Sequence, residues 1–378
     1  MSADEWERLV KISRDRLLPC IQCGKCTGGC PIALICKTFN IRRVLYEVLN
    51  TQGEEVAHHR DYLWNCSACG TCMNRCPKGV DPMDLVFTLR SILVEDGEIP
   101  LKVRDVLKSI DVRKNPWGMG KDSRAEWTEG LEVKNVADAE VLYFVCCTPA
   151  FDRRLQKIPR TIVKAFSKGA VDFGILGIEE VCCGNEIRRL GDLWNFEALR
   201  DKNMESFTTY PIKEIVVTSP HCYNAFIHDY PGLAVPIKHY TQKIDELLTE
   251  GRLAFTGDFI KKVCFHDPCF LGKHNKVFEE PRRILQAIPG LTYVEFDRAR
   301  ERSLCCEGGG GRMWIEAFDA NERTANLRVK DALDLGVEVI ATACPFCLLT
   351  LEDAVKIGGY EERLRIMDIM EIVDHVLH

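Results

Sequence analysis

Residues 20–31 read CIQCGKCTGGCP, and residues 66–77 repeat the same spacing in the sequence CSACGTCMNRCP. Both stretches follow the pattern C-x2-C-x2-C-x3-C-P, which is typical of proteins that bind two [4Fe-4S] clusters. In such proteins the fourth cysteine of each run binds the other cluster. We therefore expect one cubane cluster on Cys20, Cys23, Cys26 and Cys76, and a second on Cys66, Cys69, Cys72 and Cys30.

A pair of zinc ribbons is the alternative for these cysteines, because C-x2-C pairs also bind zinc. A structural zinc ion takes four ligands in two pairs. It has no use for a third thiolate at the same spacing or for the closing Cys-Pro, so the two runs favour iron–sulfur clusters.

The residues around the two runs indicate helices. Between the runs, five apolar side chains fall on one helical stripe, namely Ile41, Val44, Leu45, Val48 and Leu49. After the second run, Asp81 can cap a helix that begins with Pro82. We therefore predict an all-α two-cluster ferredoxin domain over residues 1–98. A connector over residues 99–137 follows, with a turn at Asn115-Pro116-Trp117-Gly118.

The remainder of the chain contains one cysteine pattern twice. The first copy, residues 138–255, has Cys147, Cys182, Cys183 and Cys222, and the second copy, residues 256–378, has Cys269, Cys305, Cys306, Cys344 and Cys347. Short apolar strands are predicted at 141–145, 215–218, 262–265 and 337–341, each ending just before these cysteines. We therefore predict two α/β units that face each other, with metal sites at the carboxyl ends of their strands.

A cysteine, a cysteine pair and a C-x2-C at these intervals resemble the CCG domain of heterodisulfide reductase. The two-cluster domain resembles the C subunit of that enzyme, and the whole arrangement resembles its D-type subunit family. Further phrases that carry the resemblance are Ser219-Pro220-His221-Cys222-Tyr223, His239-Tyr240-Thr241-Gln242, His266-Asp267-Pro268-Cys269 and the stretch 305–314. The resemblance implies a noncubane [4Fe-4S] cluster held by five cysteines, and a reaction in which two electrons and two protons open a disulfide.

The second copy contains all five cysteines of such a site. We expect Cys269, Cys305, Cys306, Cys344 and Cys347 to bind the noncubane cluster and to be the catalytic residues. Glycines 308–311 would let the backbone pass close to the cluster and aim its N–H groups at sulfur, and a flexible loop is the alternative. Glu307 stands where the family has glycine, as Gly184 does in the first copy.

The first copy is incomplete, because Ser219 stands where the family has its fifth cysteine. The four cysteines of this copy are expected to bind metal, and Cys146 lies directly before Cys147. We consider three occupants for the site, in this order: an ordinary cubane, a noncubane cluster completed by the Ser219 oxygen or by Cys146, and zinc.

Other residues near the cysteines have two interpretations each. His221, His266 and His274 could deliver protons to thiolates, or could orient loops by hydrogen bonding. Arg188, Arg189, Lys273 and Arg312 could bind an anionic substrate, or could balance cluster charge. Cys36 and Cys264 fall outside both patterns and are expected to be buried apolar thiols.

Two functions are compatible with these features. In the first, the chain is a catalytic subunit similar to heterodisulfide reductase, in which electrons pass through the cubanes to the second CCG site and reduce a small anionic disulfide. In the second, it is a non-catalytic electron-transfer subunit, similar to those of glycolate or lactate oxidases and benzoyl-coenzyme A reductase complexes. We favour the first slightly, because the five-cysteine site is complete.

The chain is expected to need a partner, because no G-x-G-x-x-G fingerprint for a nucleotide cofactor follows a strand. A flavoprotein or a membrane cytochrome b would supply the electrons. The net charge of −6 and the lack of a basic tract argue against nucleic acid. The start has no signal-peptide features and no apolar run is long enough to span a membrane. We therefore expect a cytoplasmic protein, attached to the inner face of a membrane only through a partner.

Overall fold

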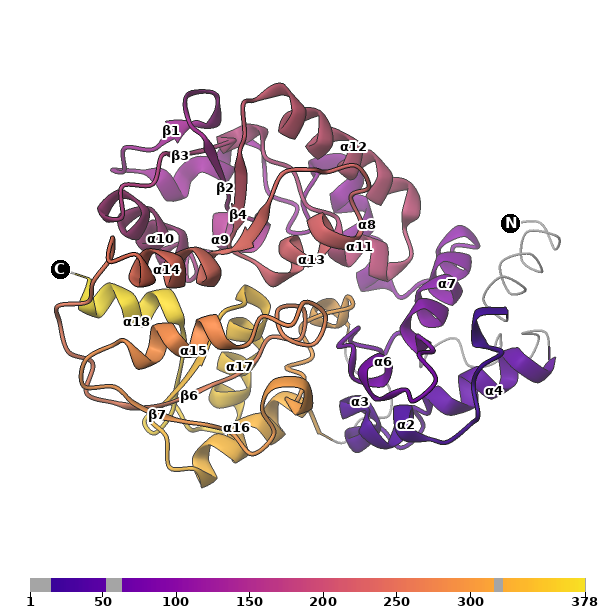
Figure 1. Cartoon of the computed structure of the whole chain (residues 1–378). Coiled ribbons are helices and arrows are strands. Elements are labelled where there is room, and N and C mark those ends of the chain that lie inside the picture. The colour runs from indigo at the N-terminus through magenta and orange to yellow at the C-terminus, as the bar shows by residue number, and fades with distance from the viewer. Residues whose placement is uncertain (1–14, 52–62, 316–321, 378) are drawn as a thin grey trace.

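The computed structural model describes residues 15–51, 63–315 and 322–377. The N-terminal segment, residues 15–98, has, among its described residues, the helices α2 (Lys25–Gly29), α3 (Pro31–Ile35), α4 (Ile41–Thr51), α6 (Thr71–Arg75) and α7 (Pro82–Glu95), which gather at one side of the molecule (Figure 1). Residues 1–14 and 52–62 lie outside the described residues. That the whole of residues 1–98 is helical therefore stays a prediction.

Two helices of this segment form as their sequences predict. In α4, Ile41, Val44, Leu45 and Val48 are buried on one stripe and Leu49 is partly buried. In α7, the Asp81 carboxylate accepts hydrogen bonds from the backbone N–H groups of Met83 (2.8 Å) and Asp84 (3.4 Å), and Pro82 is the first helical residue. Such a cap stabilises a helix by about 1 kcal/mol.

The connector contains a helix, α8 (Leu101–Arg113), that the sequence analysis missed. Its buried side chains Val103, Val106, Leu107 and Ile110 have helical spacing, so the signal was present. The turn predicted at Asn115-Pro116-Trp117-Gly118 is present. The Trp117 ring packs against Trp314 and Phe346, with 6.0 Å and 6.5 Å between the ring centroids. Trp117 Nε1 also donates to Thr148 Oγ1 at 3.2 Å. The connector thus contacts both repeats.

The first repeat, residues 138–255, forms a parallel sheet that also includes β1 of the connector, with strand order β1-β3-β2-β4-β5. Its strands are β1 (Lys134–Asn135), β2 (Val141–Phe144), β3 (Phe173–Ile175), β4 (Glu214–Val217) and β5 (Ile237–His239). The helices that follow them are α9 (Cys147–Phe151), α10 (Lys157–Lys168), α11 (Asn185–Leu190), α12 (Leu193–Thr209), α13 (Pro220–His228) and α14 (Tyr240–Thr249).

The second repeat contains a parallel sheet with strand order β7-β6-β8-β9. Its strands are β6 (Lys262–Phe265), β7 (Thr292–Val294), β8 (Val339–Thr342) and β9 (Arg365–Asp368), and its helices are α15 (Glu279–Gln286), α16 (Thr324–Asp334), α17 (Pro345–Ile357) and α18 (Ile369–Val376). This order matches β3-β2-β4-β5 of the first sheet, as expected for a duplication. All residues of β8 are buried, which is typical of a parallel strand with both faces covered.

The two repeats pack through equivalent helices. Helix α14 contacts α15, and α10 contacts α18, where the two halves of the molecule meet (Figure 1). Tyr240, the first residue of α14, donates from its hydroxyl to Asp368 Oδ1 at 2.8 Å, and Asp368 is the N-cap of α18. The two α/β units therefore face each other, as the sequence analysis predicted.

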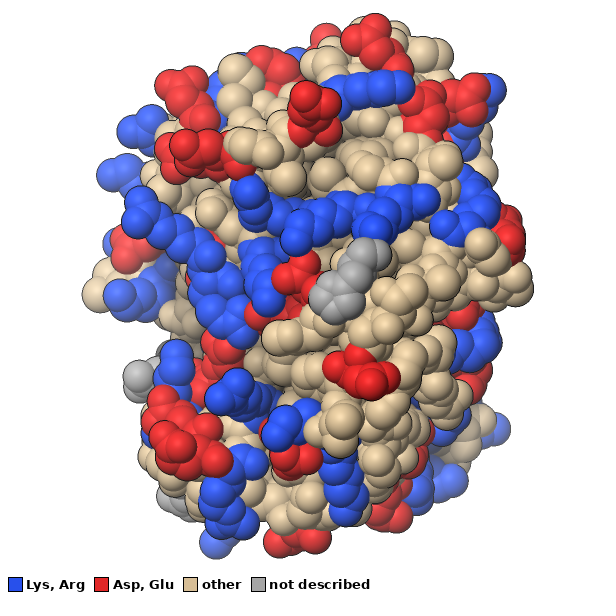
Figure 2. All heavy atoms as spheres, turned by 90° about the vertical axis from the view of Figure 1, so that its left-hand side faces the viewer, with Lys and Arg blue, Asp and Glu red and all other residues tan. Residues whose placement is uncertain are grey.

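Ion pairs also join the repeats. Arg154 of the first repeat pairs with Glu352 and Glu371 of the second, both at 2.6 Å, and Lys164 pairs with Asp374 at 2.8 Å. Figure 2 shows the face turned away from the N-terminal helices, where Lys and Arg side chains gather in a band. Within the described residues, the helices are all too short or too polar to cross a lipid bilayer.

Candidate metal centres

Two small pockets among the N-terminal helices are each lined by four cysteines. Cys20, Cys23, Cys26 and Cys76 line the first, and Cys30, Cys66, Cys69 and Cys72 line the second. The structure thus brings together the same two crossed sets that the sequence analysis assigned. Four thiol donors around one pocket fit a [4Fe-4S] cluster. The role of each cysteine as a ligand stays a prediction.

The two cysteine runs have the same backbone conformation, which explains why their motifs are alike. Gly24 (φ 78°) and Gly70 (φ 75°) are left-handed N-caps of α2 and α6. Two residues earlier, Gln22 (φ 55°) and Ala68 (φ 54°) are also left-handed, which is uncommon for residues other than glycine. Each chain segment therefore turns twice between its first and third cysteines.

The second repeat gathers its five cysteines into one buried group. Cys306 Sγ lies 3.2 Å from Cys347 Sγ. Hydrogen bonds between thiols also link Cys305 to Cys269 and to Cys306, and Cys344 to Cys347. Each of the five is at most 7% exposed. We call this group the second site.

Backbone N–H groups point at the sulfurs of the second site. Glu307 N donates to Cys305 Sγ at 3.3 Å, and Gly308 N donates to Cys306 Sγ at 3.4 Å. Glu307 has φ 70°, close to the φ of 76° at Gly184 in the first repeat. Its buried carboxylate accepts from Arg312 Nη2 at 3.2 Å and from the backbone N–H of Thr324. The charge that Glu307 adds is therefore paired within the protein.

The glycine run packs against the N-terminal segment. A Cβ on Gly310 would lie 2.8 Å from the carbonyl oxygen of Cys66, and one on Gly309 would lie 3.1 Å from that of Ser67. Gly310 also has φ 64°, a conformation that glycine adopts without strain. Glycine is needed here because the backbone of the second repeat approaches the cysteine run of the N-terminal segment.

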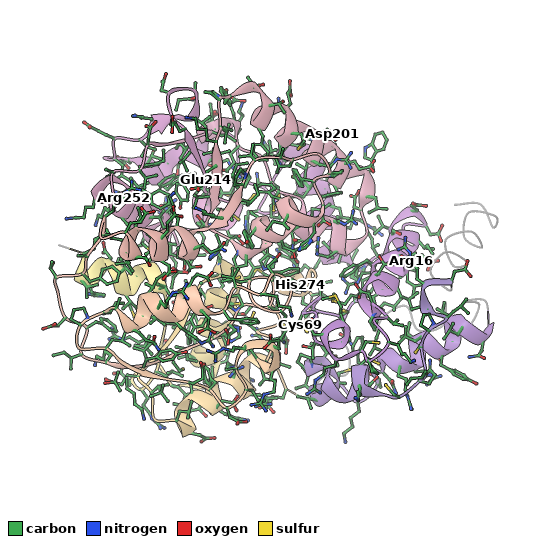
Figure 3. The ribbon with its side chains drawn as sticks, in the orientation of Figure 1. Arg16, Cys69, Asp201, Glu214, Arg252 and His274 are labelled. Atoms are coloured by element: carbon green, nitrogen blue, oxygen red, sulfur yellow. The ribbon has the colours of Figure 1, made fainter. Side chains whose placement is uncertain are left out.

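The second site touches the second N-terminal cysteine set. Cys305 Sγ donates to Ser67 Oγ at 3.3 Å, and the Cys69 thiol is hydrogen-bonded to Cys305. His274 Nε2 donates to the Ala68 carbonyl oxygen at 2.9 Å, and Figure 3 labels Cys69 and His274 where the two parts meet. Burial lowers the pKa of His274 to about 3. These observations favour a neutral His274 ring that orients the loop by hydrogen bonding over a ring that delivers protons.

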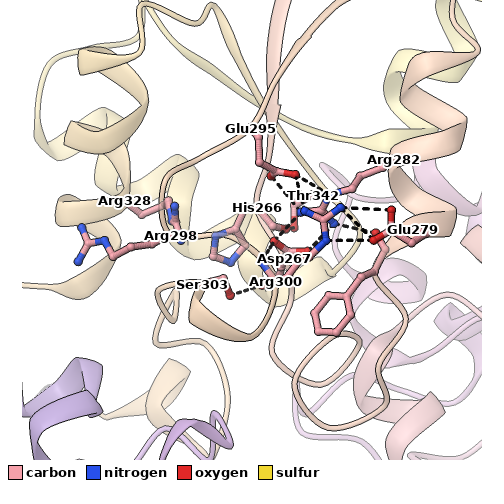
Figure 4. A network of polar contacts seen from close by, with 11 residues as sticks. His266, Asp267, Glu279, Arg282, Glu295, Arg298, Arg300, Ser303, Arg328 and Thr342 are labelled. Atoms are coloured by element: carbon pink, nitrogen blue, oxygen red, sulfur yellow. Dashed lines mark hydrogen bonds and ion pairs between the residues drawn. The ribbon is translucent and has the colours of Figure 1, made fainter. Parts of the chain in front are cut away.

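A polar network positions the loops of the second site (Figure 4). Asp267 forms two hydrogen bonds with Arg282, at 2.8 and 3.0 Å, and accepts from Arg300 N at 2.8 Å. Ser303 Oγ donates to the Asp267 carbonyl oxygen at 3.2 Å. Asp267 thereby ties the loop that carries Cys269 to the loop that leads into Cys305. His266 beside it is buried, and one of its ring nitrogens lies within 4.8 Å of Cys306 and Cys347.

The first repeat also brings its cysteines together. Thiol hydrogen bonds link Cys147 to Cys182, Cys182 to Cys183, and Cys183 to Cys222. The Cys146 thiol joins this group through a hydrogen bond to Cys222. Like the second site, this first site lies beyond the carboxyl ends of its strands, as predicted. Hydrogen bonds from Cys182 and Cys222 lower the pKa of Cys183 to about 6.

His221 lies between the two sites. It precedes Cys222 of the first site in sequence and is hydrogen-bonded to Cys344 of the second. Its Nδ1 is 2.6 Å from Glu186 Oε1, and Glu186 Oε2 accepts from Gly311 N at 2.8 Å. Burial disfavours the charged ring, but the Glu186 carboxylate and Cys344 outweigh it and raise the pKa of His221 to about 10.

The four cations singled out in the sequence all bind groups of the protein. Arg188 and Arg189 pair with Asp229 at 3.1 and 2.9 Å, and Arg312 pairs with Glu307. Buried Lys273 donates from Nζ to Thr71 Oγ1 at 2.8 Å and to the Ser303 carbonyl oxygen at 2.6 Å. These contacts favour structural and charge-balancing roles over substrate binding.

A cavity of about 480 Å³ opens beside the first site. Its lining includes Arg113, Lys114, Phe151, Val181 and buried Arg124. Arg124 Nη2 lies 3.4 Å from Cys147 Sγ and pairs with Glu180 at 2.7 Å. Local sequence does not mark Arg124 as part of the site, because it lies 23 residues before Cys147 in the chain. Cys36 and Cys264 are buried, as predicted.

Two known protein families match the N-terminal segment and the two repeats. The model of the 4Fe-4S dicluster domain covers residues 16–80, and the model of the cysteine-rich domain covers residues 141–227 and 263–352. The chain is thus an iron–sulfur protein with one dicluster domain and two cysteine-rich domains.

Curated relatives identify the family. The chain is 28% identical over 378 residues to the D-type subunit of dihydromethanophenazine:CoB–CoM heterodisulfide reductase from Methanosarcina acetivorans, covering 92% of this chain and 91% of the relative. It is 34% identical over 300 residues to EtfAB:quinone oxidoreductase from Syntrophomonas wolfei, covering 75% of this chain. It is also 34% identical over 304 residues to the probable iron-sulfur-binding oxidoreductase FadF from Bacillus subtilis, covering 77% of this chain. It spans only 42% and 43% of those two longer relatives. The chain belongs to the family of iron–sulfur proteins related to the D-type subunits of heterodisulfide reductase.

Proposed function

We propose that this chain is the iron–sulfur subunit of an oxidoreductase complex and carries electrons from its dicluster domain to the second site. The observation that carries this proposal is the contact of Ser67 and Cys69 with Cys305. Iron–sulfur clusters on these cysteines would supply the electron-carrying steps. Because a cysteine of each set takes part in this contact, electrons would cross directly from the dicluster domain to the second site.

We propose the following cluster ligands and division of the chain. The N-terminal cysteines hold two cubanes, and Cys269, Cys305, Cys306, Cys344 and Cys347 hold a noncubane cluster. The parts are residues 1–98, 99–137, 138–255 and 256–378. The partner is a flavoprotein or a membrane cytochrome b, and the chain works in the cytoplasm, attached to a membrane only through that partner.

The reaction proposed at the cysteine-rich sites is reduction of a disulfide. The S–S bond breaks, two electrons enter from the dicluster domain, and two protons complete two S–H bonds. The five cysteines of the second site and the likeness to the D-type subunits of heterodisulfide reductase support this reaction. His221 and Glu186 hold a proton at His221 Nδ1 between the two sites. Arg113, which lines the cavity beside the first site, would suit a small anionic disulfide.

A second candidate is electron transfer to a partner without any disulfide chemistry. The higher identity to EtfAB:quinone oxidoreductase favours it, as does the near-complete burial of the five cysteines in the second site. In this case the cavity beside the first site would have no substrate to bind, and both cysteine-rich sites would pass electrons onward.

Thiol release from the CoB–CoM heterodisulfide, with a reduced viologen as electron donor, separates the two candidates. Disulfide reduction predicts turnover by the natural chain, loss of turnover in Cys306→Ala, and retention in Cys264→Ala, which removes a buried cysteine outside both sites. A fully iron-loaded chain that releases no thiol would instead be an electron-transfer protein.

A further inference from the structure

The two cysteine-rich repeats differ at two equivalent positions. Cys344 is the N-cap of α17 and is followed by Pro345, while Ser219 is the N-cap of α13 and is followed by Pro220. The first repeat has thus lost a thiol at the start of this helix. It has gained one at Cys146, directly before Cys147, where the second repeat has Pro268 directly before Cys269.

The Ser219 hydroxyl is engaged at the helix end. Its Oγ accepts a hydrogen bond from the backbone N–H of His221 at 3.2 Å, which is the ordinary role of serine at an N-cap. Cys344, the counterpart of Ser219 at the start of α17, is hydrogen-bonded to Cys347 and to His221. Ser219 therefore caps α13 through its hydroxyl, whereas Cys344 at the equivalent position contacts the other cysteines of the second site.

The Cys146 thiol replaces that missing contact. It is hydrogen-bonded to Cys222, and Cys222 has the same place in α13 that Cys347 has in α17, three residues after the N-cap. Each repeat thus places an additional thiol beside the last cysteine of its pattern. In the second repeat this thiol comes from the N-cap of the helix, and in the first it comes from the loop after β2.

The backbone at Cys146 is held in an uncommon conformation. Its φ is 79° and its ψ is 153°, a combination that is strained for any residue with a side chain. The buried Glu180 carboxylate fixes it, accepting from Cys146 N at 3.0 Å and from Val145 N at 2.8 Å. Glu180 is in turn held by buried Arg124 at 2.7 Å. A strained residue kept in place by a buried ion pair marks a position that serves a site.

We propose that Cys146 is the fifth thiolate of the first site, and that Cys146, Cys147, Cys182, Cys183 and Cys222 together hold an iron–sulfur cluster. The proposal rests on the proposed function, in which the cysteine-rich repeats hold iron–sulfur clusters. It makes the two sites equal in thiol number although their fifth cysteines come from different loops. Ser219 then has a structural role and takes no part in binding metal.

Four variants of the full chain test the proposal. Cys146→Ala and Cys146→Gly both remove the thiol, and glycine also relieves the positive φ, so the glycine variant is not expected to misfold. Ser219→Ala removes the hydroxyl, and Cys264→Ala removes a buried thiol outside both sites. Each protein is loaded anaerobically with 57Fe. Iron, zinc and sulfide are then counted per chain, and a Mössbauer spectrum is recorded.

The proposal predicts that both Cys146 variants lose about four iron per chain or change the spectrum of an equal share of the iron. Ser219→Ala and Cys264→Ala should match the natural chain. Cys146 variants with unchanged iron and spectrum would overturn the proposal, as would zinc in the first site of the natural chain or a change caused by Ser219→Ala alone. Absence of thiol release in the heterodisulfide assay would count against the disulfide reaction, and the iron counts would still decide the role of Cys146.

Discussion

Lys273 is a buried cation at the point where the dicluster domain meets the second site. Its Nζ donates to Thr71 Oγ1 of the dicluster domain and to the Ser303 carbonyl oxygen, which lies two residues before Cys305. Thr71 Oγ1 also accepts from Cys69 Sγ at 3.3 Å. A buried positive charge favours the state of a nearby centre with more negative charge, because screening by water is weak there.

Replacing Lys273 by glutamine should lower the reduction potential of the centre on Cys30, Cys66, Cys69 and Cys72. Loss of the cation disfavours the reduced state, and about 59 mV corresponds to each 1.4 kcal/mol for one electron. We expect a shift of tens of millivolts in a redox titration followed by EPR. Lys276→Gln is the matched control, because Lys276 is an exposed lysine in the same loop. Equal potentials in the two variants would contradict this role of Lys273.

His239 should make the protein less stable in mild acid. The ring is buried, its Nε2 donates to the Thr218 carbonyl oxygen at 3.1 Å, and its Nδ1 accepts from Thr241. Burial lowers the pKa of His239 to about 3, while an unfolded histidine has a pKa of about 6.5. The unfolded state therefore binds more protons between these values, and stability falls by about 1.4 kcal/mol per pH unit below 6.5.

The matching measurement compares the natural chain with His239→Asn, in which asparagine can still cap α14 but does not titrate. Thermal unfolding under anaerobic conditions should show a steeper loss of stability for the natural chain between pH 7.5 and pH 5.5. Parallel pH profiles for the two proteins would show that His239 does not contribute.

At the scale of elements, the close contact of glycines 309 and 310 with residues 66–68 joins two parts of the fold. Gly310→Ala places a methyl group 2.8 Å from the Cys66 carbonyl oxygen and 3.0 Å from Ala68 N. Since backbone atoms cannot move aside cheaply, the second repeat should separate slightly from the dicluster domain. We expect lower thermal stability and slower electron transfer between the dicluster domain and the second site, measured by rapid mixing.

Gly251→Ala is the control for this prediction. Gly251 has φ 67°, close to the φ of 64° at Gly310, and a Cβ there would meet no atom within 4 Å. Both variants carry the same backbone strain, so the difference between them measures the clash alone. Equal effects of the two substitutions would show that the contact is unimportant.

Most elements near the cysteines could be predicted from local sequence. The helix caps at Asp81 and Pro82, the stripe of α4 and the strands before the cysteines follow from spacing and residue type, and the structure confirms them. Helix α8 was missed although its apolar spacing was visible. The contact of Gly310 with Cys66 could not be predicted, because it joins residues far apart in the chain and depends on how finished elements pack.

In the molecule as a whole, Arg90 joins the dicluster domain to both repeats. Its buried guanidinium donates to the carbonyl oxygens of Cys66 in the dicluster domain, Arg189 in the first repeat and Gly310 in the second, at 2.8 to 2.9 Å. Nothing in the local sequence marks Arg90 for this role, because its acceptors are backbone atoms. The two crossed cysteine sets were predictable from their spacing, but the contact of Cys69 with Cys305 depends on this docking.

EPR power saturation of the reduced cubane signals tests whether the dicluster domain contacts the second site. The natural chain and Cys306→Ala are compared at potentials where the cubane centres and the centre of the second site are all paramagnetic. In Cys306→Ala both cubanes should still form, because their predicted ligands all lie within residues 20–76. We expect the signal of the centre on Cys30, Cys66, Cys69 and Cys72 to saturate at lower power in the variant, because a neighbouring paramagnet is lost. Identical saturation in both proteins, or loss of the cubane signals from the variant, would contradict it.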